Sequence, residues 1–196
     1  MPPYPERETA ENLLREGERL NPGPWGDHCR WVALCAEKIA AACGLDGEKA
    51  YVLGLLHDIG RREGVKHLGH VYDGWDYLNR LGYPEAAKIC LTHSFNTGRL
   101  EDYIGRFDIP EDRQREIREA LAACVFDDYD RLIQLCDALA GAEGVMGLEK
   151  RMTNVKNRYG FYPRDKWEKN FALKTYFDQK CGCDIGRLLA DAQIRR

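Results

Sequence analysis

A titratable pair, His57-Asp58, stands at the end of an apolar helical stretch that contains residues 54–56, and Gly60 follows directly after Ile59. Burying a polar group without a partner costs roughly 2–7 kcal/mol, so a fold that encloses this pair must supply compensation. A bound metal ion would satisfy both side chains at once. The chain has five histidines, and none of them follows His93. This clustering favours one shared site in the first half of the chain.

The hydrophobic pattern predicts helices along most of the chain. Apolar residues recur at helical spacing, Gly and Pro mark the expected ends, and no run alternates as a strand would. Helices are predicted at 6–20, 25–43, 47–58, 71–81, 84–93, 110–124, 128–140, 148–158, 163–180 and 184–195, with loops at 60–69 and 94–107. We therefore predict an all-α protein without a substantial sheet. Residues 1–24 would pack on a domain of residues 25–140, which residues 141–196 would extend.

The composition is that of one globular domain with no general affinity for polyanions. Of the 196 residues, 44% are hydrophobic and 31% are charged, and the net charge of −3 gives no attraction to nucleic acid or to an anionic membrane. No stretch reaches the ~20 apolar residues of a membrane span. The first residues lack the basic and apolar regions of a signal peptide. We expect a cytoplasmic protein, and the sequence leaves open whether it forms a homodimer.

Positive charge is concentrated towards the C-terminus. Residues 149–180 hold nine Lys or Arg and four acids, so this segment is either a solvated helical face or a source of substrate contacts. Its aromatic residues are expected to pack the last helices onto the domain. A base-stacking role for Tyr159 or Tyr162 is the alternative.

The candidate metal ligands lie mostly at helix ends, where several helices can direct side chains into one space. One of them, Asp137, lies instead within an apolar helix, where a buried carboxylate needs a cation or another partner. Imidazole and carboxylate ligands suit iron, manganese, zinc and related divalent ions. The candidates are His28, His57, Asp58, His70, His93 and Asp137. His67, three residues before His70, is the alternative to it.

These residues resemble the HD superfamily of metal-dependent phosphohydrolases, whose pattern is a histidine, an adjacent His-Asp pair and a distant aspartate. The flanking segments 28–32, 56–61 and 136–139 are similar to the family's motifs, and two further histidines match a subset that holds two metals. The resemblance covers residues 25–140. It implies a first metal bound by His28, His57, Asp58 and Asp137, with Asp58 bridging to a second metal that His70 and His93 also bind. Iron or manganese is expected, with zinc, nickel, cobalt or magnesium as alternatives.

The family's chemistry implies cleavage of a phosphate ester or anhydride in a nucleotide or another small phosphorylated molecule. Two metals roughly 3.5–4 Å apart can hold a hydroxide and clamp the phosphoryl oxygens, with the pKa of water lowered toward about 7. Asp58 and Arg61 are the candidate catalytic residues. Phosphoryl transfer also needs fixed positive charge, so Arg61, Arg62 and Lys66 are the candidate substrate-binding residues.

Two other functions fit the same residues. A few HD proteins use the six-ligand site with two irons to activate oxygen on a small hydroxylated substrate. A non-catalytic module could bind a nucleotide and signal through the C-terminal helices. Among hydrolases, the surroundings of His93 are similar to those in bacterial diadenosine tetraphosphatases. The chain departs from these enzymes after Asp137, where residues 141–144 replace an expected arginine-containing stretch.

Overall fold

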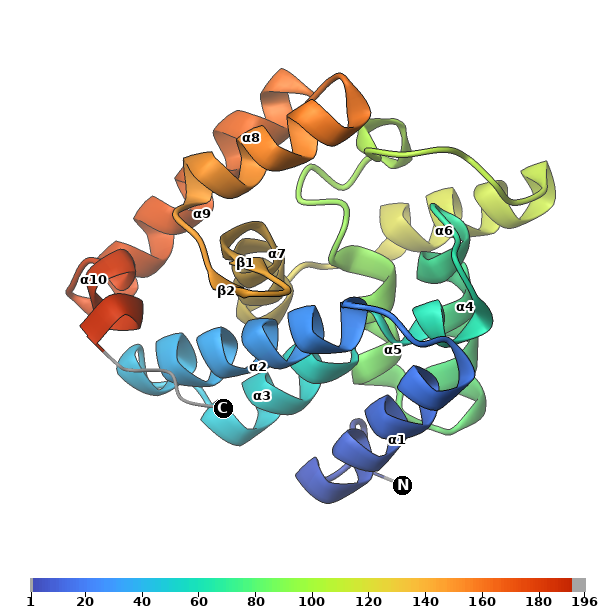
Figure 1. The fold of residues 1–196 in the computed structure, drawn as a ribbon, viewed down its shortest axis with the longest axis horizontal. Helices are drawn as coiled ribbons and strands as arrows, with labels where there is room; N and C mark the ends of the chain where they lie inside the picture. The colour runs from blue at the N-terminus through green and yellow to red at the C-terminus, as the bar shows by residue number, and fades with distance from the viewer. Residues whose placement is uncertain (1, 192–196) are drawn as a thin grey trace.

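Helices form nearly all of the regular structure in the computed structural model, which describes residues 2–191 (Figure 1). This confirms the all-α prediction. The two strands are only two residues long and form a small hairpin, with Ala140 opposite Val145. In chain order the elements are α1 (Arg7–Leu20), α2 (Trp25–Ala42), α3 (Gly47–Leu56), the 3₁₀ helix η1 (Ile59–Glu63), α4 (Gly69–Arg80), α5 (Pro84–Thr92), the 3₁₀ helix η2 (Leu100–Asp102), α6 (Glu111–Ala123), α7 (Asp128–Leu139), β1 (Ala140–Gly141), β2 (Gly144–Val145), α8 (Leu148–Tyr159), α9 (Arg164–Cys181) and α10 (Ile185–Asp191).

The core is built on α2 and α3, which pack closely together, and on α7, which Figure 1 shows almost end-on between them and the C-terminal helices. Every residue of α3 from Ala50 to Leu56 is buried. Gly54 permits the close packing, because a Cβ there would lie 2.9 Å from the Cα of Ala33 on α2. The glycine therefore sets the distance between the helix that carries His28 and the helix that ends at His57.

A second close approach joins η1 to α4. A Cβ on Gly60 would overlap the carbonyl oxygen of His70 and the backbone nitrogen of Gly74. Only a residue without a side chain fits there. The expected loop 60–69 thus begins as the 3₁₀ helix η1, and this helix brings the segment after Asp58 directly against the first turn of α4.

The predicted helix 71–81 begins two residues earlier than expected, at Gly69. The reason is a contact from a distant loop, because the Asp108 carboxylate accepts hydrogen bonds from the backbone N–H groups of His67 (2.6 Å) and Gly69 (2.9 Å). His70 therefore lies inside the first turn of α4. At the start of α7, Asp127 and Asp130 form a capping box.

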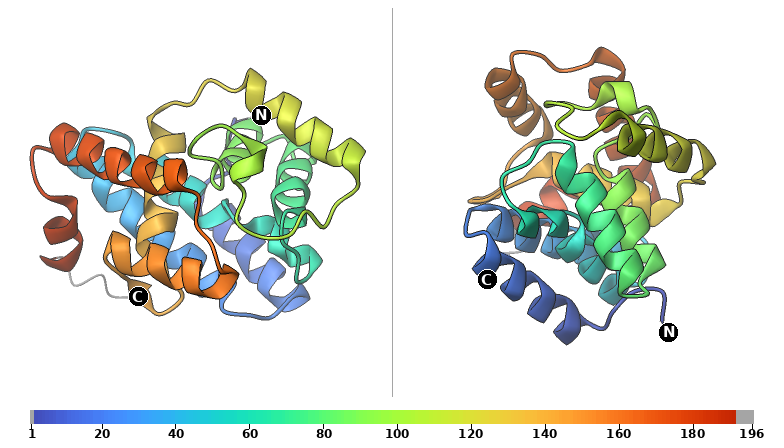
Figure 2. Two further views of the ribbon diagram at one scale, coloured as in Figure 1. Left: turned by 90° about the horizontal axis from the view of Figure 1, so that it is seen from above. Right: turned by 90° about the vertical axis from the view of Figure 1, so that its right-hand side faces the viewer.

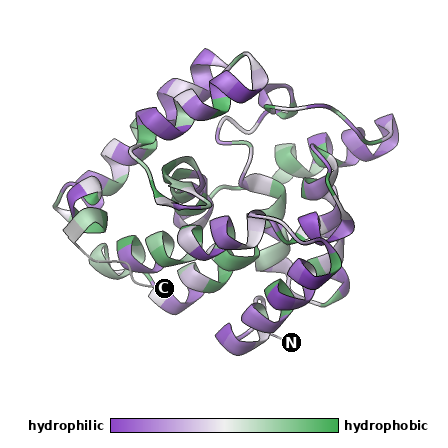
Figure 3. Ribbon diagram, in the orientation of Figure 1, coloured by the Kyte–Doolittle hydropathy of each residue, from purple (hydrophilic) through white to green (hydrophobic). Residues whose placement is uncertain are grey.

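The segment between α5 and α6 is ordered by its own small apolar cluster, to which Phe95, Leu100 and Tyr103 contribute. It rises from α5 towards α8 and α9, which arch over α7 (Figures 1 and 2). Figure 3 shows that these two helices are largely hydrophilic along their length. Inward-facing residues such as Leu173 and Phe177 nevertheless join the main core. Within the described residues, no helix is both long and apolar enough to cross a membrane.

Candidate metal centre

The structure brings all six candidate ligands together in two adjoining groups. One group consists of His28, His57 and Asp137, and the other consists of Asp58, His70 and His93. In each group, one possible ligand atom per residue lies within 4.8 Å of the others. The groups adjoin at His57 and His93, whose ring centroids are 5.1 Å apart. The predicted convergence of side chains from separate helices is therefore present.

The second group is almost completely enclosed. The Oδ1 atom of Asp58 lies 3.0 Å from Nε2 of His70 and 3.5 Å from Nε2 of His93, and these two nitrogens are 3.3 Å apart. A ligand atom lies about 2.0–2.2 Å from a bound divalent ion, so ligand atoms on one ion are roughly 3–3.5 Å apart. The observed spacing is the one that a shared cation requires.

Hydrogen bonds to the backbone determine which ring nitrogen of three histidines faces the centre. Nδ1 of His57 lies 2.7 Å from the carbonyl oxygen of Gly54, and Nδ1 of His93 lies 2.8 Å from that of Cys90. Nδ1 of His70 makes the same kind of bond to the carbonyl of His67. A carbonyl oxygen only accepts, so each Nδ1 donates and each neutral ring directs the lone pair of Nε2 inward. Such outer hydrogen bonds orient metal-binding histidines in proteins.

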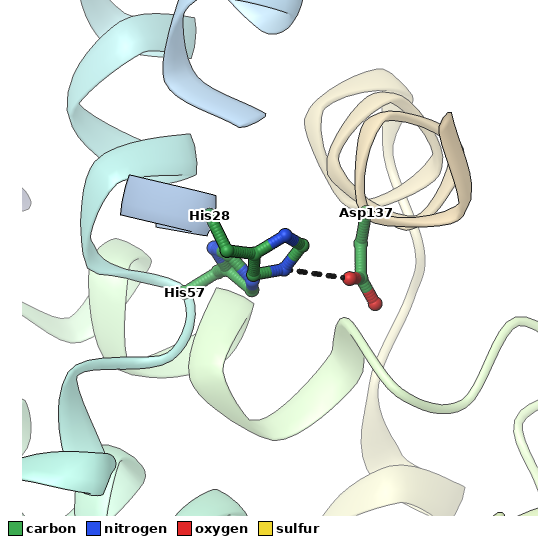
Figure 4. Close-up of side chains that lie close together, drawn as sticks. All are labelled: His28, His57 and Asp137. Atoms are coloured by element: carbon green, nitrogen blue, oxygen red, sulfur yellow. Dashed lines mark ion pairs between the residues drawn. The ribbon is translucent and has the colours of Figure 1, made fainter. Parts of the chain in front are cut away.

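The first group is partly exposed to solvent at Asp137, and Figure 4 shows how its three side chains lie. Nε2 of His28 lies 3.0 Å from Oδ1 of Asp137 and donates to it, because a carboxylate oxygen only accepts; the dashed line in the figure marks this pair. The side chain of His57 is completely buried, whereas that of Asp137 is 30% exposed. A small molecule would therefore reach this group from the side of Asp137 on α7.

The unpaired polar atoms in the centre fit a metal ion. Nε2 of His57 and Oδ1 of Asp58 are buried without a hydrogen-bond partner. In the second group, two imidazole lone pairs and a carboxylate oxygen point at one another, which is repulsive unless a cation lies among them. Nitrogen and oxygen donors of this kind suit the divalent ions of iron, manganese or zinc. The residues present thus fit the group that the sequence predicts.

Electrostatics in the centre keep His57 and His70 neutral and the two carboxylates charged. Burial lowers the pKa of His57 to about 4 and also lowers that of His70. Burial alone would raise the pKa of Asp58, but the charge of Arg61 and the neighbouring histidines outweigh it and hold the pKa well below its ordinary value. Burial alone would also raise the pKa of Asp137, but the hydrogen bond from His28 and the neighbouring histidines outweigh burial and lower it. These are the protonation states that metal binding needs.

The four remaining predicted residues have different surroundings. Arg61 is at the centre, with Nε 2.5 Å from Oδ2 of Asp58. Arg62 instead pairs with Glu16 of α1 and stacks on the Tyr77 ring of α4, so its guanidinium serves the packing of those helices.

Lys66 pairs with Asp73 at 2.5 Å. His67 lies outside both ligand groups, with its ring 6.0 Å from that of Tyr159. The geometry thus favours His70 over His67 as the ligand. The substrate-binding roles of Arg61, Arg62 and Lys66 stay predictions.

The structure adds neighbours of the centre that the sequence did not single out. The Tyr103 ring lies 6.5 Å from that of His70. Asn96, three residues after His93, binds the backbone of Lys166 on α9. Lys166 was only one of the nine basic residues at 149–180, and nothing in its local sequence separates it from the others. Such contacts depend on how α9 packs, which no spacing in the sequence reports.

Comparison with known proteins agrees with this geometry. The family model for the HD domain matches residues 25–141, which is more than half of the chain. A search of curated proteins and a search of solved structures found no match to it. The similarity to diadenosine tetraphosphatases therefore stays a prediction.

Proposed function

The chain belongs to the HD-domain family, a superfamily of metal-dependent phosphohydrolases, and from that premise we propose that it hydrolyses a phosphate ester or anhydride in a nucleotide or another small phosphorylated molecule. We propose two divalent ions, of iron or manganese, one in each group of ligands. The single observation that carries the proposal is the complete set of six ligands, with unpaired inward-facing atoms on His57 and Asp58.

The chemistry that the ions supply when bound is the lowering of the pKa of water and the polarisation of phosphoryl oxygens. The protein's own residues define the site around them. Asp58 is placed between the two groups, with Oδ1 towards His70 and Oδ2 3.9 Å from Nε2 of His57. Both of its oxygens can therefore be used, which is what a bridging role requires.

Arg61 has two tasks in this proposal. Through Nε it holds Oδ2 of Asp58 and so orients the carboxylate. Its side chain is 32% exposed, and the guanidinium has further N–H groups that can donate to an anion. Fixed positive charge of this kind stabilises the charge on a transferring phosphoryl group.

A partly exposed aromatic ring near the second group supports a nucleotide as the substrate. Tyr159 lies 6.0 Å from the ring of His67, three residues before the ligand His70, and offers a flat apolar surface. Bases stack on such rings at about 1–3 kcal/mol each.

The test is phosphate release from nucleoside mono-, di- and triphosphates and from p-nitrophenyl phosphate by protein loaded with Mn²⁺ or, without air, Fe²⁺. Asp58→Asn preserves the shape of the side chain but removes its charge, and it should abolish both metal binding and hydrolysis. Asp76→Asn, at an exposed position of α4, is the matched control. Hydrolysis that survives in Asp58→Asn would refute the proposal, and oxygen consumption without phosphate release would replace it by the di-iron oxygenase.

A further inference from the structure

A network of polar side chains joins α9 to the segment that follows His93. Nδ2 of Asn96 donates to the backbone carbonyl of Lys166 (3.1 Å) and to Oδ1 of Asn170 (2.7 Å). Nδ2 of Asn170 in turn donates to the hydroxyl of Tyr162 (2.8 Å). Asn96 and Asn170 are both buried. This network ties the C-terminal helices to the residues beside the metal centre.

The directions of these bonds can be deduced without ambiguity. The carbonyl of Lys166 only accepts, so the atom of Asn96 that faces it must be the amide nitrogen. Oδ1 of Asn170 receives the second N–H, and the amide nitrogen of Asn170 therefore faces Tyr162. The tyrosine oxygen accepts from it, which leaves the phenolic hydrogen for another acceptor. Tyr162 is thus arranged to donate.

Lys166 is a cation with no carboxylate of its own. Its ammonium binds the backbone carbonyl of Ser94, the residue next to His93. Within residues 2–191 the structure shows no ion pair to Lys166, although the residue is half-buried. A buried or partly buried charge is ordinarily paired. The ammonium of Lys166 is therefore held beside the metal centre, and two of its N–H groups remain available to donate to an anion.

The charge of Asp137 acts on both residues, so both lie within electrostatic range of the first group. It raises the pKa of Tyr162, after burial as the larger cause. Burial lowers the pKa of Lys166 to about 8, against the charges of Asp137 and Asp102, so the ammonium is still the major form at pH 7.

We propose that Lys166 and Tyr162 bind the phosphoryl oxygens of the substrate, and that they select a phosphate monoester, with its two negative charges, over a diester. This inference rests on the proposed function. Both side chains offer donors only to the region near Asp137, and a dianion with several acceptor oxygens meets that need best. Segments outside the matched HD domain would in this way determine what the centre accepts.

The test uses the full chain loaded with Mn²⁺ and two readouts. The first is calorimetric titration with inorganic phosphate, and the second is kcat/KM for p-nitrophenyl phosphate against bis(p-nitrophenyl) phosphate. Lys166→Gln should weaken phosphate binding roughly ten-fold to a hundred-fold, as expected for a lost hydrogen bond from a charged group. It should also lower kcat/KM for the monoester far more than for the diester. Tyr162→Phe should show the same pattern at roughly two-fold to ten-fold.

Matched controls on α9 are Lys169→Gln, which removes an exposed lysine, and Tyr176→Phe, which removes a tyrosine hydroxyl that binds Asp128 on the outer side. Both should leave the two readouts unchanged. The inference is overturned if Lys166→Gln binds phosphate as Lys169→Gln does, or if Lys166→Gln loses metal. If the unaltered protein releases phosphate neither from these esters nor from the nucleotides named above, the proposed function fails, and the phosphate titration still decides the roles of Lys166 and Tyr162.

Discussion

The carbonyl oxygen of His70 occupies the space in which a Cβ of Gly60 would stand. This contact holds η1 against α4 and so sets Asp58 beside His70. We predict that Gly60→Ala lowers the free energy of unfolding by about 1–3 kcal/mol or more, because backbone atoms must move to relieve the overlap. It should also remove one equivalent of bound metal, measured by elemental analysis.

Gly147→Ala is the control, since nothing lies within 4 Å of a Cβ at Gly147 and its backbone angles suit any residue. If Gly60→Ala binds two equivalents with unchanged stability, the close approach does not position the ligands.

The metal-free protein should lose stability in mild acid. The pKa of His57 is lowered by burial from 6.5 to about 4, so between these values the unfolded chain binds a proton that the folded protein does not. The free energy of unfolding is therefore highest above pH 6.5 and falls as the pH drops towards 4. His57 contributes up to about 3 kcal/mol to this loss at ~1.4 kcal/mol per pH unit, and the lowered pKa of His70 acts in the same direction.

Urea unfolding with EDTA at pH 7.5, 6 and 5 measures this dependence. His57→Gln should flatten the slope between pH 6.5 and 4, whatever its effect on stability at pH 7.5. Equal slopes for the two proteins would show that His57 is not the titrating group.

The sequence was informative where local pattern determines structure. Helical periodicity and end signals predicted the all-α fold, and the positions of His28, His57 and His93 at helix ends predicted that their side chains converge. It could not decide between His67 and His70, because the start of α4 depends on Asp108, a residue about forty positions away that caps the segment.

Two further points required the packed structure. Arg61 and Arg62 are indistinguishable as neighbouring arginines, yet one holds Asp58 and the other is bound by Glu16 and Tyr77. The sequence could not distinguish Lys166 from the other basic residues, because its contact with the carbonyl of Ser94 depends on how α9 crosses that segment. Contacts between distant segments decide such cases, and periodicity carries no information about them.

A partly buried ion pair connects the helix that ends at His93 with the helix of Asp137. Nζ of Lys88 lies 2.5 Å from Oδ2 of Asp130, a fully buried carboxylate that also accepts from Thr92 at 2.7 Å. Lys88→Met should destabilise the protein by about 3–5 kcal/mol in urea unfolding, since it leaves the Asp130 charge without its partner.

The exposed Lys150 gives the control, Lys150→Met, for which no change is expected. The double variant Lys88→Met/Asp130→Asn should recover part of the loss, because the stranded charge is gone. A double variant as unstable as Lys88→Met alone would contradict this explanation.

Arg61 and Arg62 are neighbouring arginines with different contacts, so each serves as the control for a substitution of the other. Arg61→Gln should lower kcat/KM for a phosphorylated substrate by roughly 10²-fold or more, because a charge-assisted contact to the phosphoryl group and the support of Asp58 are lost together. Arg62→Gln should instead lower the thermal midpoint and leave kcat/KM within about two-fold, since its contacts are with α1 and α4. Reversed effects in the two variants would show that Arg62, not Arg61, faces the substrate.

Anomalous diffraction from crystals of the protein loaded with Mn²⁺ or Fe²⁺, collected at the absorption edge of the metal, tests the central claim most directly. Two peaks are predicted, one bound by His28, His57 and Asp137 and one bound by His70 and His93, with Asp58 shared between them. Crystals that show no peak at either group, or peaks only elsewhere on the molecule, would contradict a metal centre built from these six side chains.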